Sequence, residues 1–238
     1  MRPLFRIAGV LCMLLGMVAA PSADAQDVQA DAPVFVAGDK IDFVDERGII
    51  DRTVVAAEGT TRTYRIVEPD GDVWLQYYDE SSNRTLSERE DGGKRIVVRP
   101  STGKYDFPLF VGKTWSGSNL TTVFVGNGMQ SVVTEVYRTD FACEVQCIEL
   151  IEVPAGRFEA FRISCEQQRS DRPFAQRQTY WFSPVVGGNV RNEFVRTDTN
   201  EIYDRYELHG FARATYPIFD VLPDGVESSC LLTVASQQ

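Results

Sequence analysis

Four cysteines in the second half of the chain are the residues whose chemistry is easiest to interpret. They are Cys143, Cys147, Cys165 and Cys230. Closely spaced CxxC pairs, which supply the ligands of many structural zinc sites, are absent from this set. The start of the chain predicts export, and an even number of cysteines in an exported chain is typical of disulfides. The sequence therefore favours two disulfides over a four-thiolate zinc site.

One expected hairpin favours a particular disulfide. Pro154-Ala155-Gly156 has the composition of a turn between two strands. A register that places Ile151 opposite Phe161 also places Cys147 opposite Cys165. Directly opposed β-carbons in antiparallel strands lie about 4.5–5.5 Å apart, close to what a disulfide requires. We therefore predict a Cys147–Cys165 disulfide.

The other two cysteines would then form the second bridge. Cys143 and Cys147 lie four residues apart, which is roughly 13 Å in an extended strand and too far for a direct bond. The sequence therefore predicts a Cys143–Cys230 disulfide that ties the C-terminal segment to the sheet. A slip of one residue at the turn would place Cys165 on the opposite face from Cys147 and break the first pairing.

Catalytic and metal-binding patterns are weak. The chain has one histidine, His209, without a placed nucleophile, which is more typical of a surface position near the end of a strand than of a catalytic base. Glu68, Asp70 and Asp72 surround one turn but lack the ligand set of a calcium loop. We expect no cofactor and no metal, and an enzyme is the less favoured class. A hydrolase with paired carboxylates stays open, because sequence does not show which acids face each other.

Large aromatic side chains could bind a ligand. Trp74, Trp115 and Trp181 all lie in or beside expected strands. The first interpretation is that they fill the core. The functional interpretation is that they line the mouth of a half-open barrel and hold an apolar small molecule or lipid. We therefore predict these three tryptophans as ligand-binding residues.

Short β-type segments must position these residues. Segments rich in Val, Ile, Thr and aromatic residues lie at 61–67, 73–78, 95–98, 121–125, 131–137, 179–182 and 202–208, between turns rich in glycine, asparagine and aspartate. Apolar residues recur with a period nearer two than 3.6, for example at 62–67 and 158–163. The pattern predicts an all-β fold, an antiparallel meander that curves into a partly closed, lipocalin-like barrel.

The first 25 residues resemble a secretory signal peptide. Arg2 and Arg6 are followed by an apolar run at 7–20 and then by Ala23-Asp24-Ala25, a small-x-small cleavage pattern. The apolar run is shorter than the roughly 20 residues that a membrane-spanning helix needs. We expect cleavage after Ala25, a periplasmic location and no transmembrane segment in the mature chain.

Composition limits the partners and the domain organisation. The formal net charge of −10, without a local cluster of Lys or Arg, disfavours binding to nucleic acid or to an anionic membrane surface. Residues 26–33, rich in Ala, Asp and Gln, are expected to be flexible, and residues 34–234 to form a single β domain.

Three motifs in the second half occur in a familiar order. They are FPL (107–109) with VGKTW (111–115), VPAGRF (153–158), and YWFSP (180–184) with Gly187. Residues 107–194 thereby resemble the TapB-like family of uncharacterised exported bacterial proteins. The resemblance implies exported β structure and brings no catalytic residues. The chain differs from the family pattern in its cysteines and at Arg157. More loosely, residues 73–79 resemble strands of periplasmic lipoprotein carriers.

The sequence leaves three functional hypotheses. The leading hypothesis is a non-enzymatic periplasmic β domain that binds a hydrophobic small molecule, a lipid or a partner protein on the concave face of its sheet. The second is an envelope structural or assembly factor whose exposed strand edge pairs with another protein. The third is the carboxylate-dependent hydrolase.

Overall fold

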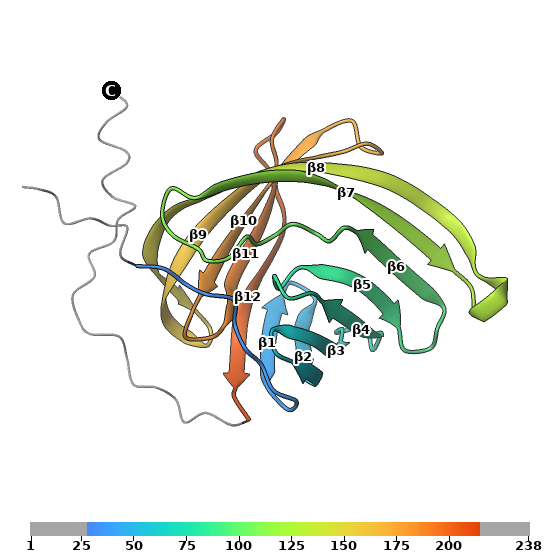
Figure 1. Cartoon of the computed structure of the whole chain (residues 1–238), viewed down its shortest axis with the longest axis horizontal. Helices are drawn as coiled ribbons and strands as arrows, with labels where there is room; N and C mark the ends of the chain where they lie inside the picture. Colours follow the sequence, from blue (N-terminus) through green and yellow to red (C-terminus); the bar gives the residue numbers. More distant parts are fainter. Residues whose placement is uncertain (1–27, 215–238) are drawn as a thin grey trace, which may run out of the picture.

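The structure is a computed structural model that describes residues 28–214 and consists almost entirely of β-strands (Figure 1). The strands are β1 (Lys40–Asp45), β2 (Gly48–Glu58), β3 (Thr61–Val67), β4 (Val73–Tyr78), β5 (Arg84–Arg89), β6 (Lys94–Arg99), β7 (Thr114–Val125), β8 (Val132–Val153), β9 (Gly156–Arg169), β10 (Ala175–Ser183), β11 (Gly188–Arg196) and β12 (Ile202–Ala212). A short 3-10 turn, η2 (Gly128–Gln130), joins β7 to β8. Within the described range, no helix is long and apolar enough to cross a membrane. The expected signal peptide and Cys230 lie outside these residues.

Each strand pairs antiparallel with its neighbours in the chain, and β1 pairs with β12. The all-β antiparallel barrel is thereby confirmed. The barrel is closed, because Lys40–Val44 of β1 lie beside Glu207–Ala212 of β12. This pairing gives hydrogen-bond partners to the two strands that would otherwise form the edges of the meander.

Period-two alternation places side chains on the two faces of the sheet as the sequence predicts. In β3, Arg62, Tyr64 and Ile66 are buried, and the residues between them are half-buried. The turn that follows this strand contains Gly71 at a φ of 88°, a left-handed conformation that glycine adopts without a steric penalty.

The β8–β9 hairpin forms where the sequence predicts it, but with a different register. Val153 pairs directly with Gly156, so the turn consists of Pro154 and Ala155 alone. Ile151 consequently lies opposite Phe158, three residues nearer the turn than expected. A further register shift between Val145 and Cys147 marks an irregularity in the ladder.

This register changes the disulfide pairing. Cys143 lies opposite Cys165, with 4.0 Å between their Cα atoms, and the two form a disulfide. The predicted Cys147–Cys165 pair, and with it Cys143–Cys230, is therefore wrong, because the two-residue turn and the irregularity move Arg162 opposite Cys147. Cys147 is itself disulfide-bonded. Cys230, the fourth cysteine of the expected set, lies outside the described residues.

The buried apolar side chains form two core clusters. Ala30, in the segment expected to be flexible, is buried and exchanges backbone hydrogen bonds with Leu109 of the β6–β7 loop. Phe35 is also buried and lies close to Gly187 of the β10–β11 turn. The segment before β1 and the β6–β7 loop therefore close the end where the β10–β11 turn lies.

Candidate functional site

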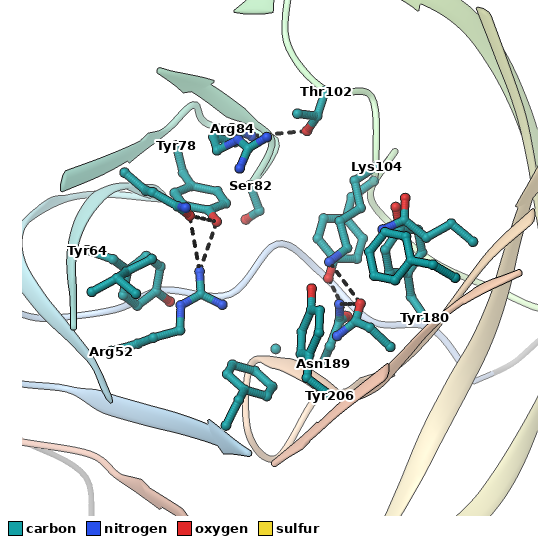
Figure 2. A pocket seen from close by; sticks show the side chains of 18 of the residues that line it. Arg52, Tyr64, Tyr78, Ser82, Arg84, Thr102, Lys104, Tyr180, Asn189 and Tyr206 are labelled. Atoms are coloured by element: carbon teal, nitrogen blue, oxygen red, sulfur yellow. Dashed lines mark hydrogen bonds between the residues drawn. The ribbon is translucent and has the colours of Figure 1, made fainter. Parts of the chain in front are cut away.

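A cavity of about 480 Å³ lies inside the barrel. Inward-facing side chains of most strands line it, and the β6–β7 loop contributes Lys104 and Tyr105 (Figure 2). The volume falls in the range of small-molecule sites, roughly 300–1,000 Å³. The cavity reaches the barrel end that carries the β1–β2 and β3–β4 turns, because Asp45, Arg47 and Glu68 are also part of its lining.

Six cationic side chains line this cavity, and two of them, Arg47 and Arg169, form ion pairs with carboxylates. The other four are here called the cation cluster. They are Arg52 of β2, Arg62 of β3, Arg84 of β5 and Lys104 of the β6–β7 loop. Figure 2 shows Arg52, Arg84 and Lys104 around one space. Among the described residues, none of the four lies within 4.0 Å of a carboxylate oxygen. The charges of the cluster are therefore not compensated by ion pairs.

Neutral groups hold two of the arginines. Nη2 of Arg52 donates to Oη of Tyr78 at 3.0 Å, and its guanidinium lies 5.0 Å from the ring centre of Tyr64. Arg62 donates from Nε to Oη of Tyr64 at 3.1 Å and from Nη1 to Oγ of Ser82 at 3.0 Å. Tyrosine hydroxyls and ring faces stabilise a guanidinium without neutralising its charge.

Several donors in the lining have no acceptor. Nε of Arg52, Nε of Arg84 and Nδ2 of Asn192 are buried without a hydrogen-bond partner among the described residues. The backbone of Arg84 hydrogen-bonds to Thr102, donating to its Oγ1 at 3.2 Å and accepting from its N–H at 3.1 Å. A buried donor without an acceptor costs on the order of 1–3 kcal/mol. The residues that line the cavity thus contain N–H groups whose hydrogen-bonding capacity the described residues do not fill.

Lys104 has the most perturbed electrostatic environment of the cluster. Its Nζ lies 4.0 Å from the ring centre of Tyr180 and donates to Oδ1 of Asn192 at 3.3 Å. Burial, together with repulsion from Arg52, Arg84 and Arg62, lowers the pKa of Lys104 well below its usual value. An anion beside Nζ would reverse that effect.

The acids that line the cavity gather at its mouth. Arg47 contacts Asp45 at 2.6 Å and Glu68 at 3.4 Å. Burial raises the pKa of Glu68, and burial together with the charge of Asp45 raises the pKa of Asp204. At Asp45, burial is outweighed by the hydrogen bonds and charge of Arg47, which lower its pKa. The cavity is therefore acidic at the mouth and cationic inside.

The structure places none of the three predicted tryptophans in the lining of this cavity. Trp181 is buried, and its Nε1 donates to Glu149 of β8 at 2.6 Å. Trp115 donates to the carbonyl of Gly103 at 2.9 Å, and Trp74 packs against the main core cluster. Their role in ligand binding remains a prediction without support from this cavity.

Sequence reasoning missed the cation cluster, although one signal was present. In the expected strand at 61–67, Arg62 shares a face with Tyr64 and Ile66, so a charged residue lies on the apolar face. A buried arginine needs a partner or a function. The other three cations come from separate elements, and nothing in the sequence brings them together.

Metal-binding and histidine chemistry play no part in this geometry. Across residues 28–214, no three His, Cys, Asp or Glu side chains are grouped closely enough to hold a metal ion. His209 lies on β12 with an exposed side chain, as the sequence predicts for a surface histidine.

Comparison with known proteins identifies the fold. An exported protein from Bacteroides fragilis, described as having a YmcC-like fold, superposes with a TM-score of 0.50 at 13% identity, over 77% of this chain and 100% of its own. The chain shares this YmcC-like fold. Weaker matches are the hypothetical lipoprotein YmcC of Escherichia coli (TM-score 0.43, 11% identity, 79% and 87% coverage) and a lipoprotein of Parabacteroides distasonis (0.36, 14%, 79% and 100%).

Comparison of the sequence with known proteins does not assign the chain to a family. No family model matches the chain, and no curated protein matches it. The resemblance of residues 107–194 to the TapB-like family therefore stays a prediction. The YmcC-like neighbours agree with it only in being exported proteins or lipoproteins.

Proposed function

We propose that this protein is an exported, non-enzymatic binding protein whose barrel takes up a small molecule. The observation that carries the proposal is the cavity of about 480 Å³ inside a closed barrel, lined by converging polar and aromatic side chains. Such a combination of enclosed volume with a few oriented polar groups is typical of ligand sites. Export to the periplasm follows from the signal-like residues 1–25.

The lining favours a different ligand from the purely hydrophobic one expected from the tryptophans. Polar side chains such as Gln76, Gln178 and Asn189 face the cavity beside the aromatic rings of Tyr180 and Phe194. These amides hydrogen-bond to neighbouring side chains. A wholly apolar ligand would nevertheless leave the buried N–H groups of Arg52, Arg84 and Asn192 without acceptors, which costs free energy. The proposed ligand therefore carries polar groups.

A carboxylate-dependent hydrolase fits this site less well. Asp45 and Glu68 at the mouth both contact Arg47, which keeps Asp45 ionised and occupies the space between the two acids. A glycosidase pair instead needs one protonated acid facing one free carboxylate across the substrate. We therefore prefer binding to hydrolysis.

A second candidate function is binding of a partner protein at one strand edge. β8 pairs with β9 only from Thr139 onward, and Arg138 exchanges hydrogen bonds with Ser170. Within residues 28–214, the stretch 132–137 therefore has no strand partner on that side. Val132, Val133 and Val136 in this stretch are exposed. An extended segment of another protein could add a strand there. Sedimentation of the wild type and cross-linking to partner proteins test this role. A monomeric wild type, together with the same cross-linked partners in the wild type and in the double variant Val133→Glu with Val136→Glu, would exclude it.

The binding proposal is tested by filling the cavity. Thr121 on β7 is buried and lines the cavity, whereas Thr122 lies outside that lining. Native mass spectrometry of protein purified from a periplasmic extract should show a bound small molecule in the wild type and in Thr122→Trp. Thr121→Trp should lose it, because the indole occupies the ligand volume.

A second filling variant guards against a folding defect. Asn119→Phe places a ring in the same cavity from another position of β7. Both filled variants should keep the cooperative thermal unfolding of the wild type. Either a wild type without a bound molecule or equal occupancy in the wild type and both filled variants would refute binding inside the barrel.

A further inference from the structure

We propose that the cavity binds a small organic anion, with its charged group seated among Arg52, Arg62, Arg84 and Lys104. This inference rests on the proposed binding function and adds the chemical class of the ligand. The anionic group is of the phosphate or carboxylate type, and the rest of the molecule lies against the tyrosine rings. The chain as a whole is acidic, so this cavity has the opposite sign to the molecule's net charge.

The first argument is the concentration of uncompensated charge. Four cations from four separate elements face one cavity, and the acids in its lining are gathered around Arg47 at the mouth. Charges removed from bulk water without a counter-charge destabilise the folded state. Retaining four of them in one place is explained if an anion provides the counter-charge.

The second argument is the arrangement of free donors. Nε of Arg84 and Nε of Arg52 are buried without acceptors among the described residues, while Nη2 of Arg52 donates to Tyr78. Guanidinium groups offer planar pairs of N–H donors that match the oxygens of phosphate and carboxylate. A polar but uncharged ligand could accept these hydrogen bonds, yet it would leave the repulsion within the cluster unrelieved.

The third argument concerns the body of the ligand. A bare inorganic ion would fill only a fraction of about 480 Å³. Tyr64, Tyr180 and Tyr206 present ring surface beside the cation cluster (Figure 2). Aromatic surface in a site favours apolar or ring-containing ligand groups. The geometry therefore points to an organic anion.

The test compares two fluorescent probes that share one aromatic body. Anilinonaphthalenesulfonate carries a sulfonate, and N-phenylnaphthylamine is the same molecule without it. Binding of each to the dialysed mature protein is measured by fluorescence titration. We expect the sulfonate probe to bind at least tenfold more tightly than the neutral probe, and inorganic phosphate or a dicarboxylate to displace it.

Two variants locate the charge preference. Arg84→Met with Lys104→Met removes two cations, and the tenfold preference should fall to about twofold or less, because two charges of the site are lost. Arg65→Met with Lys40→Met is the matched control. Arg65 pairs with Glu90 on the outside of β3, and Lys40 is exposed on β1, so this variant should keep the full preference.

The outcomes separate the two proposals. If both probes bind equally to the wild type and Thr121→Trp abolishes both, the barrel binds ligands but the anion assignment is wrong. The anion assignment is also wrong if Arg84→Met with Lys104→Met unfolds cooperatively and keeps the tenfold preference for the sulfonate probe. If neither probe binds, or if binding is unaffected by Thr121→Trp and Asn119→Phe, the cavity is not a ligand site and the proposed function fails as well.

Discussion

The ammonium nitrogen of Lys104 lies 4.0 Å from the ring centre of Tyr180 on β10, and no carboxylate of the described residues pairs with it. The β6–β7 loop thus inserts a cation into the barrel against neutral partners only. Loops usually cover a surface. Here the loop contributes a charged group to the cavity. The effect of this group on the free energy of unfolding can be measured in the ligand-free protein.

The first prediction concerns Lys104 and pH. The pKa of this lysine in the folded protein lies well below its unfolded value of about 10.4, so between the two values the unfolded state binds more protons. The free energy of unfolding should therefore rise with pH in that window, by at most about 1.4 kcal/mol per pH unit. Lys104→Met should remove this rise. Urea unfolding at several alkaline pH values, without ligand, measures the slope.

Lys40→Met, which alters an exposed lysine, serves as the control and should keep the wild-type slope. Burial raises the pKa of Tyr78, but Arg52, Arg84 and Arg62 outweigh it and lower that pKa. Burial raises the pKa values of Tyr64, Tyr105, Tyr180 and Tyr206, and their contributions to the slope have the opposite sign. All three proteins contain these tyrosines, so the prediction concerns the difference between their slopes. Equal slopes for the wild type and Lys104→Met would show that Lys104 is not held in this environment.

The second prediction concerns the disulfides. Non-reducing peptide mapping should recover a peptide pair joined through Cys143 and Cys165, which lie 22 residues apart in the sequence. Replacing both with alanine should lower the free energy of unfolding by about 3 kcal/mol, because the crosslink restricts the unfolded chain. We also expect Cys147 to be joined to Cys230. A Cys147–Cys165 peptide would mean that the hairpin has the register expected from sequence.

The third prediction concerns closure of the barrel. Leu208 on β12 is fully buried and lies opposite Phe43 of β1, where the first and last strands meet. Leu208→Ala should lower the free energy of unfolding by about 3 kcal/mol, because it leaves a cavity in the core. His209→Ala, at the neighbouring exposed position, should change it by about 0.5 kcal/mol or less. Equal effects in thermal or urea unfolding would contradict the closed β1–β12 seam.

The sequence alone determined the β class and located several of the strands, whereas β1, β2, β5 and β11 were not among the expected segments. Alternation at a period of two depends only on neighbouring side chains, and β3 shows it in the structure as it does in the sequence. The Pro154–Gly156 hairpin was likewise predictable, because proline and glycine restrict or permit particular backbone angles locally. Fold class and candidate disulfide residues follow from such local signals.

The register of the β8–β9 hairpin and the pairing of its cysteines depended on details of the turn and of the ladder. The position and length of the turn, and the irregularity between Val145 and Cys147, decide which cysteine meets Cys165. Each alternative differs by a few hydrogen bonds in a long ladder, and the sequence near the turn does not distinguish them.

The candidate site was decided by the tertiary structure. Arg52, Arg62, Arg84 and Lys104 lie on four different elements, and only closure of the barrel turns them toward one cavity. The net charge of −10 is a sum over the whole surface, so it does not predict the sign of an enclosed space. Composition reports how many charges a chain has, whereas the distances between them, on which electrostatic energy depends, are set by the fold.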